Sequence, residues 1–141
     1  LMNSCHIIHN ETELKTYASE IAKQCSEQYC IALHGALGVG KTTFVKYLGQ
    51  SWNIFDVKSP SFDIVNVHIG QRRLIHMDAY RLNHQDLITF AIDDLCIPPF
   101  CLIVEWPECL PTTIPFNLHL HFSILSDSSR QIITKKITDV S

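Results

Sequence analysis

The chain has 141 residues, of which 46% are hydrophobic and 18% charged, and its formal net charge is -3. This length favours one domain, and the composition is typical of a folded globular protein rather than a disordered one. The acidic balance argues against nucleic-acid binding by the chain itself, because such surfaces usually carry a basic excess. The six cysteines form no C-x-x-C pair, and there is neither a signal-peptide pattern nor an apolar run of about 18 residues. These features predict a soluble, cytoplasmic protein with reduced thiols and no membrane contact.

The first half of the chain predicts a helix, a strand, a glycine-rich loop and a second helix. Asn10 followed by Glu13 has the pattern of a helix N-cap, and apolar residues recur at helical spacing up to Cys25. A short apolar strand is predicted over Tyr29–His34, and the glycine-rich loop follows it at once. The second helix is predicted from apolar residues that share one of its faces: Phe44, Val45, Leu48 and Trp52.

Three more strands and a short helix are expected in the middle of the chain. Two strands, Phe62–Ile69 and Arg72–Asp78, are separated by a tight turn at Gly70–Gln71. A short helix is expected from His84 to Asp94. The run from Phe100 to Glu105 is wholly apolar before its acidic end, as expected of a strand buried on both faces.

The end of the chain completes the predicted fold. The sequence alternates between apolar and polar residues on both sides of a turn at Asp127–Ser129, which predicts an antiparallel hairpin. Together the elements indicate an α/β fold, namely a P-loop NTPase-like three-layer sandwich with a mixed central sheet. We expect a single P-loop ATPase domain over residues 1–141.

The loop GALGVGKT matches the phosphate-binding pattern G-x-x-x-x-G-K-T in its proper context of strand, loop and helix. Gly35 and Gly40 allow backbone conformations that turn consecutive N–H groups toward an anion, and the following helix adds its positive end. Lys41 is predicted to reach the outer phosphates of a nucleotide, and Thr42 to offer its hydroxyl to Mg²⁺. The predicted nucleotide-binding residues of the loop are Gly35, Ala36, Leu37, Gly38, Val39, Gly40, Lys41, Thr42 and Thr43, the last of these with helix packing as its alternative role.

Two acidic residues, Asp78 and Glu105, each close an apolar strand. A magnesium nucleotide needs at least one carboxylate near the metal, usually at the end of a neighbouring strand. A charge near a core is costly without a partner, although either residue could simply cap its strand at the solvent edge. The phosphate loop favours a metal-binding or water-activating role for both.

Three further features stay ambiguous when judged from the residues alone. The turn KSPSFD, from Lys58 to Asp63, could touch a terminal phosphate and change state on hydrolysis, or be an ordinary turn. Arg81 could bind a phosphate or form a surface salt bridge. His119 and His121 have the spacing of a metal-binding pair, but without a third ligand evident nearby we expect ordinary exposed strand histidines.

The motifs GALGVGKTTF, SPSF, HMDAYRL and LIVEWPE, in this order in one short chain, resemble the TsaE family, also called YjeE, of small bacterial P-loop ATPases. The resemblance runs from about Thr12 to about Arg130. It implies a role in forming threonylcarbamoyladenosine in tRNA beside the anticodon. It further implies that ATP is hydrolysed while the protein is docked on the TsaB–TsaD heterodimer, which this step resets between turnovers, so that tRNA is reached only indirectly.

The resemblance also implies roles for individual residues. Lys41 and Thr42 would bind the phosphates and Mg²⁺ of ATP or ADP. Glu105 would be a second magnesium ligand, and Asp78 would orient or deprotonate the attacking water. Ser59, Pro60 and Ser61 match the family's switch segment. The further residues assigned to nucleotide binding by this resemblance are Thr12, Ser59, Ser61, Trp106 and Arg130.

The sequence departs from the family pattern at three positions. Ala36 stands where an acidic residue is common, Ser61 replaces the usual threonine of the switch, and Ala91 lies where glycine is frequent. None of these departures changes Lys41, Thr42, Asp78 or Glu105. ATP binding is therefore still expected.

Other P-loop proteins carry features that can be compared with this sequence. A GTPase would be expected to carry an N-K-x-D motif, and the sequence has none. A small-molecule kinase could use Arg72, Arg73 and Arg81, but the chain leaves little room for a lid domain. A nucleotide-switched, non-catalytic binding module stays open, because both acidic residues could hold Mg²⁺ without activating water. Under the preferred ATPase reading we expect weak activity alone and dependence on the partner.

Overall fold

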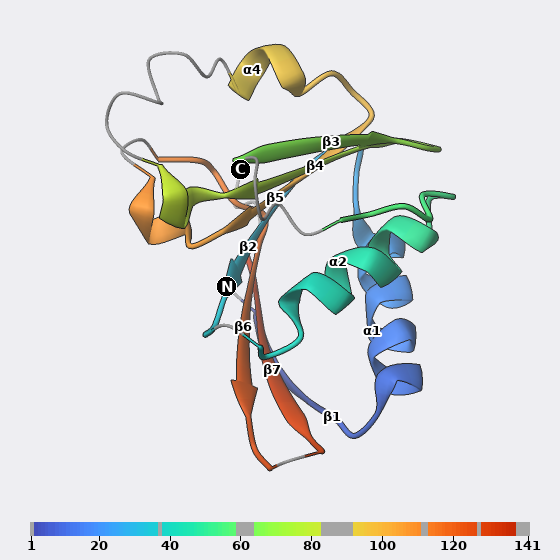
Figure 1. Cartoon of the computed structure of the whole chain (residues 1–141), viewed down its shortest axis with the longest axis vertical. Helices are drawn as coiled ribbons and strands as arrows, with labels where there is room; N and C mark the ends of the chain where they lie inside the picture. The colour runs from blue at the N-terminus through green and yellow to red at the C-terminus, as the bar shows by residue number, and fades with distance from the viewer. Residues whose placement is uncertain are drawn as a thin grey trace.

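The computed structural model describes residues 2–36, 38–58, 64–82, 92–110, 113–126 and 128–137. Seven strands form one sheet in the spatial order β1-β7-β6-β2-β5-β4-β3 (Figure 1). The strands are β1 (Met2–Ile8), β2 (Gln28–His34), β3 (Val65–Ile69), β4 (Arg73–Asp78), β5 (Phe100–Glu105), β6 (Leu118–Ile124) and β7 (Arg130–Lys136). The helices are α1 (Glu11–Gln24), α2 (Lys41–Gln50) and α4 (Ile92–Leu95), with the 3-10 turns η1 (Ala79–Arg81) and η2 (Pro107–Cys109). None of the described helices is long and apolar enough to cross a membrane.

The sheet is mixed, as the sequence predicts. The central strands β4, β5, β2 and β6 run parallel, whereas β3–β4, β6–β7 and β1–β7 are antiparallel pairs. The edge strand β1 was not predicted, because its sequence MNSCHII lacks a strict alternation of polar and apolar residues. It is defined by its backbone pairing with β7, from Met2 opposite Lys136 to Ile8 opposite Arg130.

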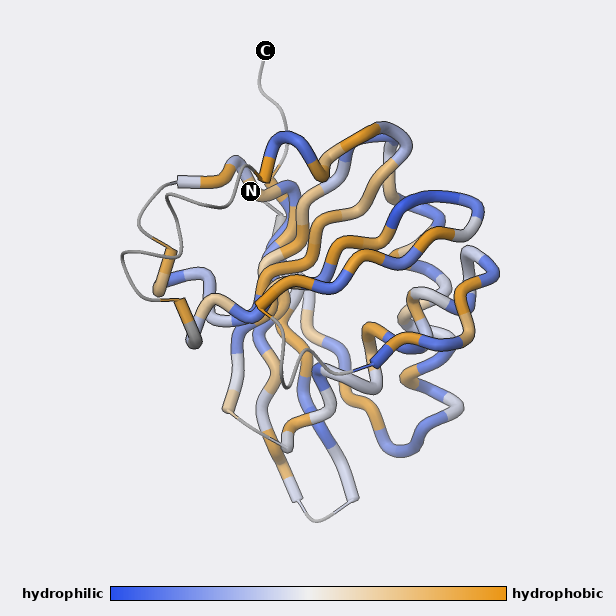
Figure 2. Tube along the Cα trace, turned by 45° about the horizontal axis from the view of Figure 1, so that its top comes forward, coloured by the Kyte–Doolittle hydropathy of each residue, from blue (hydrophilic) through white to orange (hydrophobic). Residues whose placement is uncertain are grey.

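Each face of the sheet has its own hydrophobic core. The helices α1 and α2 lie side by side on one face (Figure 1), where Phe44 and Leu48 pack against strand residues such as Ile103. On the other face α4, η1, η2 and the adjoining segments cover a second cluster that includes Ile75 and Leu102. Figure 2 shows that hydrophobic residues concentrate in the central strands. The fold is therefore the predicted α/β sandwich, with two long helices in one outer layer and short helical turns in the other.

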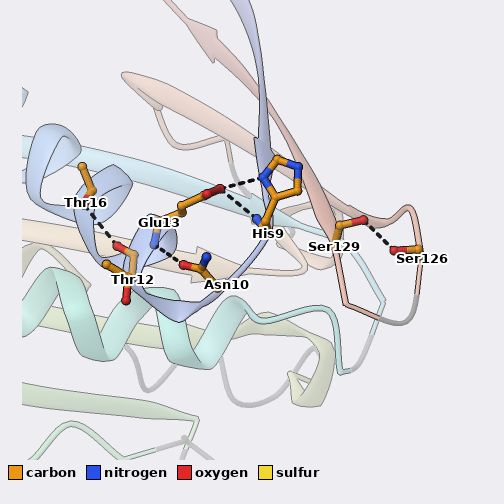
Figure 3. A network of polar contacts seen from close by, with 7 residues as sticks. All are labelled: His9, Asn10, Thr12, Glu13, Thr16, Ser126 and Ser129. Atoms are coloured by element: carbon orange, nitrogen blue, oxygen red, sulfur yellow. Dashed lines mark hydrogen bonds and ion pairs between the residues drawn. The ribbon is translucent and has the colours of Figure 1, made fainter.

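The first helix begins at the predicted residue, with one difference in its capping. Asn10 accepts a hydrogen bond from the Glu13 amide at 2.9 Å. The Glu13 carboxylate reaches one residue further back and accepts from His9, from its amide at 3.0 Å and from its ring Nδ1 at 2.8 Å (Figure 3). The buried residues of the helix follow the predicted spacing: Leu14, Tyr17, Ala18, Ile21 and Ala22.

Two predicted elements are described only in part. The first strand of the β3–β4 hairpin begins at Val65, after a bend at Ile64, and its predicted start at Phe62 belongs to residues 59–63, which lie outside the described residues. The helix predicted from His84 to Asp94 is described only as α4, which ends one residue later at Leu95. Residues 83–91 lie outside the described part of the chain.

Candidate nucleotide-binding site

The glycine-rich loop joins the end of β2 to the start of α2. Its backbone has φ values of 141° at Gly35 and 103° at Gly40, which other residues adopt only with strain. A Cβ at Gly35 would also lie 2.7 Å from the carbonyl oxygen of Phe122, so a side chain does not fit there. Gly40 is the N-cap of α2, whose first amide groups have no partner within the helix. The loop therefore presents a helix N-terminus that suits a phosphate group.

Lys41, the first residue of α2, is turned into the loop rather than into solvent. Its side chain is 5% exposed, and its Nζ donates to the Gly35 carbonyl at 2.6 Å. The same Nζ lies 3.5 Å from Oε1 of Glu105 and 5.0 Å from the centre of the Trp106 ring. The fold thus holds a cation at the loop, beside a carboxylate from the end of β5.

Glu105 is a buried carboxylate between two basic side chains. Its Oε2 accepts a hydrogen bond from Nε2 of His76 at 2.6 Å, while its Oε1 faces Lys41. Burial opposes ionisation of this carboxyl group, but the contacts with His76 and Lys41 outweigh it, so the pKa of Glu105 lies below its ordinary value. Glu105 is therefore ionised at neutral pH and offers the type of oxygen ligand that Mg²⁺ prefers.

Asp78 ends β4 directly beside Glu105, because the two residues are register partners of parallel strands. Partners in such a pair direct their side chains to the same face of the sheet. Asp78 also accepts a hydrogen bond from the amide of Tyr80 at 3.1 Å and so caps the turn η1. The structure brings together the two acidic strand ends and the lysine of the loop, which the sequence predicted separately.

Trp106 follows Glu105 with an unusual backbone conformation. Its φ of 56° and ψ of 52° lie in the left-handed region, which costs a bulky residue about 1–3 kcal/mol. Its ring lies near Lys41, and the centre of the Tyr80 ring is 5.2 Å from the centre of the Trp106 ring. The ring of Tyr80 is largely exposed. An aromatic pair therefore borders the lysine side of the loop.

A pocket of about 290 Å³ lies between the loop, the start of α1 and the β6–β7 hairpin. Its lining includes Gly38, Gly40 and Thr43 of the loop and Arg130 of the hairpin. The Arg130 guanidinium donates to the backbone carbonyls of residues 126 and 129, which anchor it at the hairpin tip. The structure thus places Arg130, predicted only from resemblance, beside the phosphate loop.

Thr12 lies on the first turn of α1, next in the chain to a residue that lines this pocket. It is exposed on the first turn of α1, and its carbonyl accepts from the Thr16 hydroxyl at 3.1 Å (Figure 3). Its neighbours Glu11 and Leu14 line the pocket, together with Asn10. The start of α1 is therefore close to the loop, although Thr12 itself is not among the lining residues.

A family model described as "Threonylcarbamoyl adenosine biosynthesis protein TsaE" matches residues 8–133. The chain belongs to the TsaE family. It is 33% identical over 130 residues to the tRNA threonylcarbamoyladenosine biosynthesis protein TsaE of Aquifex aeolicus. This match covers 89% of this chain and 91% of the Aquifex aeolicus protein. The protein of the same name from Treponema pallidum is 29% identical over 119 residues, covering 82% of this chain and 88% of its own. The resemblance seen in the motifs is thus confirmed.

A solved structure agrees with this assignment. The crystal structure of Bacillus subtilis YdiB matches with a TM-score of 0.75 and 25% sequence identity, over 97% of this chain and 87% of that one. The P-loop fold predicted from the sequence is therefore confirmed.

Some residues named in the sequence analysis lie outside the described residues. They are the loop residue Leu37, the switch residues Ser59, Pro60 and Ser61, and Ala91, which stands where TsaE proteins often have glycine. The described loop residues differ in exposure. Ala36, where TsaE proteins commonly have an acidic residue, is exposed, whereas the Val39 side chain is buried in the core below α1 and α2.

The arginines considered for a kinase lie away from the TsaE-type site. Arg72 is buried at the amino-terminal end of β4 and donates to the carbonyls of Cys25, Ser26 and Phe100, the last at 2.9 Å. Arg73 donates to the Leu95 carbonyl at 3.5 Å, also at this end. Both bind backbone at the end of the sheet opposite the phosphate loop. The side chain of Arg81 lies outside the described residues.

The strand histidines differ from the prediction of ordinary exposed residues. His119 and His121 are half-buried and contact His34, the last residue of β2. His34 Nε2 and His119 Nδ1 are 3.0 Å apart, and the rings of His34 and His121 stack at 4.2 Å. The third histidine was missed because parallel pairing of β2 with β6, which sequence spacing does not reveal, brings it there. Burial is the main reason that the pKa of His34 is lowered to about 4.

The oxygen ligands at the loop fit a nucleotide-bound magnesium ion. In the described residues, no group of three or more His, Cys, Asp or Glu side chains is arranged to hold a metal ion. Mg²⁺ in nucleotide sites usually takes one or two protein oxygens and completes its octahedron with water and phosphate. The Thr42 hydroxyl at the start of α2 and the ionised Glu105 carboxylate are ligands of this kind. Both therefore suit Mg²⁺ bound together with a nucleotide.

Proposed function

We propose that this chain is a P-loop ATPase that binds Mg–ATP and acts in the biosynthesis of threonylcarbamoyladenosine in tRNA. Membership of the TsaE family and the names of the relatives from Aquifex aeolicus and Treponema pallidum support the biosynthetic role. One observation carries the ATPase assignment. Lys41 contacts the first glycine of the phosphate loop and the carboxylate at the end of β5 at the same time, with Asp78 on the adjacent strand end.

Each of these residues has a defined task in the proposed reaction. The loop amides and Lys41 bind the outer phosphates, which places the γ-phosphate at the mouth of the loop. Thr42 and Glu105 hold the Mg²⁺ ion, which supplies charge neutralisation of the phosphates when bound. Asp78 orients the attacking water or removes its proton, and it works from the strand end next to Glu105.

The pocket between the loop, α1 and the hairpin is a suitable place for the rest of the nucleotide. It adjoins Gly38, Gly40 and Thr43, and Arg130 borders it. Its volume of about 290 Å³ is close to the lower end of the range for small-molecule sites, roughly 300–1,000 Å³. Of the other residues assigned through the resemblance, Thr12 follows the lining residue Glu11 on the first turn of α1, and the Trp106 ring lies 5.0 Å from Nζ of Lys41.

We further propose that hydrolysis is weak in the isolated chain and is completed on a TsaB–TsaD heterodimer. Hydrolysis then resets that complex between turnovers, and the chain reaches tRNA only through it. The net charge of -3 supports indirect contact, since tRNA would favour a basic surface. Partner-assisted phosphoryl transfer has a physical basis, because a second protein can supply or order groups that stabilise the transition state.

The test is ATP hydrolysis by the purified chain, alone and with TsaB and TsaD from the same organism. We expect little turnover alone and a marked rise with the pair, lost in Lys41→Ala. An unstimulated protein that binds ATP but forms no complex would contradict the partner role. Transfer of phosphate to a small molecule instead of water would favour a kinase, and nucleotide binding with no turnover under any condition would favour a non-catalytic switch module.

A further inference from the structure

His76 is a polar residue in the middle of an otherwise apolar strand. It is fully buried, between Ile75 and Met77, which are also buried. Its Nε2 lies 2.6 Å from Oε2 of Glu105, on the neighbouring strand β5. The ionised carboxylate only accepts hydrogen bonds, so the His76 ring is the donor.

The stability of the core does not explain this side chain. Its second ring nitrogen, Nδ1, is buried and has no hydrogen-bond partner among the described residues. A buried polar atom without a partner costs free energy, and replacing buried polar pairs by apolar residues of similar volume is often neutral or stabilising. Apolar residues in place of both His76 and Glu105 would therefore serve the core at least as well as the pair, whereas removal of His76 alone would leave Oε2 of the buried Glu105 without its donor.

We propose that His76 is a positioning residue that fixes the orientation of Glu105 toward the bound Mg²⁺ ion, an inference that rests on the proposed function. The hydrogen bond to Oε2 stops rotation of the carboxylate about its last bond. It thereby directs Oε1 to the phosphate loop, where that oxygen already lies 3.5 Å from Nζ of Lys41.

The chemistry of Mg²⁺ makes this orientation important. The ion demands nearly ideal octahedral geometry with short bonds to oxygen, so a freely rotating carboxylate is a poorer ligand than a fixed one. Mutation of a group that hydrogen-bonds a metal ligand typically lowers metal affinity by about 10- to 100-fold. For loss of the His76 hydrogen bond we therefore expect an effect of about 10-fold or more. Lys41 cannot replace His76 in this task, because the lysine faces the other carboxylate oxygen.

Two substitutions of similar size and polarity separate positioning from packing. Gln in His76→Gln places its side-chain nitrogen near the position of Nε2, whereas Asn in His76→Asn is shorter and places it near Nδ1. The measurement is ADP binding by calorimetry at increasing Mg²⁺ concentration, followed also by the fluorescence of Trp106. Each variant is compared with wild type, with Glu105→Gln and with the double variant His76→Asn/Glu105→Gln.

We expect His76→Asn to raise the Mg²⁺ concentration for half-maximal ADP binding by about 10-fold or more, and His76→Gln to restore it to within about threefold of wild type. Affinity for ADP without Mg²⁺ should not change in either variant. In the Glu105→Gln background His76→Asn should have no further effect on the Mg²⁺ dependence, because His76 acts through that carboxylate.

Three results would overturn the inference: a wild-type Mg²⁺ dependence in His76→Asn, equal losses in the Asn and Gln variants, or additive effects of His76→Asn and Glu105→Gln. Any of these, obtained while wild type binds Mg–ADP, leaves the proposed function standing. Failure of the wild-type chain to bind nucleotide at all would instead overturn the proposed function and this inference together.

Discussion

Arg72 and Lys41 are both buried cations, but they are satisfied in different ways at opposite ends of the sheet. Arg72 donates to three backbone carbonyls, which belong to the end of α1 and the start of β5, and it lies 4.9 Å from the Trp52 ring. Lys41 donates to one loop carbonyl and faces a carboxylate. Backbone carbonyls are fixed by the fold, whereas a carboxylate and a loop carbonyl can be exchanged for phosphate oxygens.

The comparison separates a structural cation from one that we propose to bind a ligand. Arginine's planar group suits several fixed acceptors at once, which ties helix and strand ends together. Lysine is a point charge on a flexible stem and can move from Glu105 to a phosphate. Burial alone therefore does not identify a functional cation, since both residues are buried. The kind of acceptor that the cation contacts distinguishes the two roles.

The largest effect is expected for Lys41→Ala. We expect ATP affinity to fall by about 100-fold or more, because the charge-assisted bonds to the phosphates, about 1.5–3 kcal/mol each, are lost. Calorimetry or nucleotide-induced change in Trp106 fluorescence measures it. Unchanged ATP affinity would remove Lys41 from the site and would erase the distinction from Arg72.

Asp78→Ala tests the same end of the sheet and leaves Lys41 in place. Turnover in the presence of the partner pair should fall by about 100-fold or more, because the water loses its orienting base, while ATP affinity stays close to wild type. The measurement is phosphate release alongside ATP binding. A collapse of affinity would make Asp78 a structural or metal-binding residue instead.

Arg72→Met should lower the stability of the protein and leave nucleotide binding unchanged. We expect the free energy of unfolding to fall by about 2–4 kcal/mol, because several buried carbonyls lose their donor. Urea unfolding measures the loss, and ADP binding by the folded variant should equal that of wild type. Arg73→Met is the matched control and should cost less than about 1 kcal/mol, since Arg73 makes one long contact in the described residues. Equal losses for both variants would contradict the structural role of Arg72.

The smallest expected effect is a pH dependence of stability that comes from the half-buried histidines His34, His119 and His121. Burial lowers the pKa of His34 from 6.5 to about 4, and His121, His119 and Lys135 add to this while Glu108 opposes it. The unfolded chain therefore takes up a proton near pH 6.5 and the folded chain only near pH 4. Stability should be complete above pH 6.5 and fall by about 1–2 kcal/mol as the pH drops to 4, after allowance for solvent at this half-buried group.

His34→Phe tests this pH effect, because it keeps a ring to stack on His121 and removes the titration. Its unfolding free energy should depend less on pH between 6.5 and 4 than that of wild type, as followed by urea unfolding at several pH values. Parallel pH profiles for the two proteins would show that His34 does not titrate in this range.

Much of the site was readable from the sequence because its signals are local. The spacing of Gly35, Gly40 and Lys41 follows the phosphate-loop pattern, whose residues are close together in the chain, so it appears as a short motif. The acidic ends of the apolar strands were likewise visible as Asp78 and Glu105. Long-range pairing was not visible: the edge strand β1 and the approach of His34 to the β6 histidines depend on which strands become neighbours.

The phosphate-loop motif, the central strands and the family could be predicted from the sequence alone, because local backbone chemistry and hydrophobic periodicity are visible in consecutive residues. The position of Glu105 between His76 and Lys41, and the binding of Arg72 to backbone carbonyls, became evident only in the folded structure. These contacts join residues far apart in the chain. They follow from the parallel register of β4 and β5 and from the packing of α2 on the sheet, which no short stretch of sequence specifies.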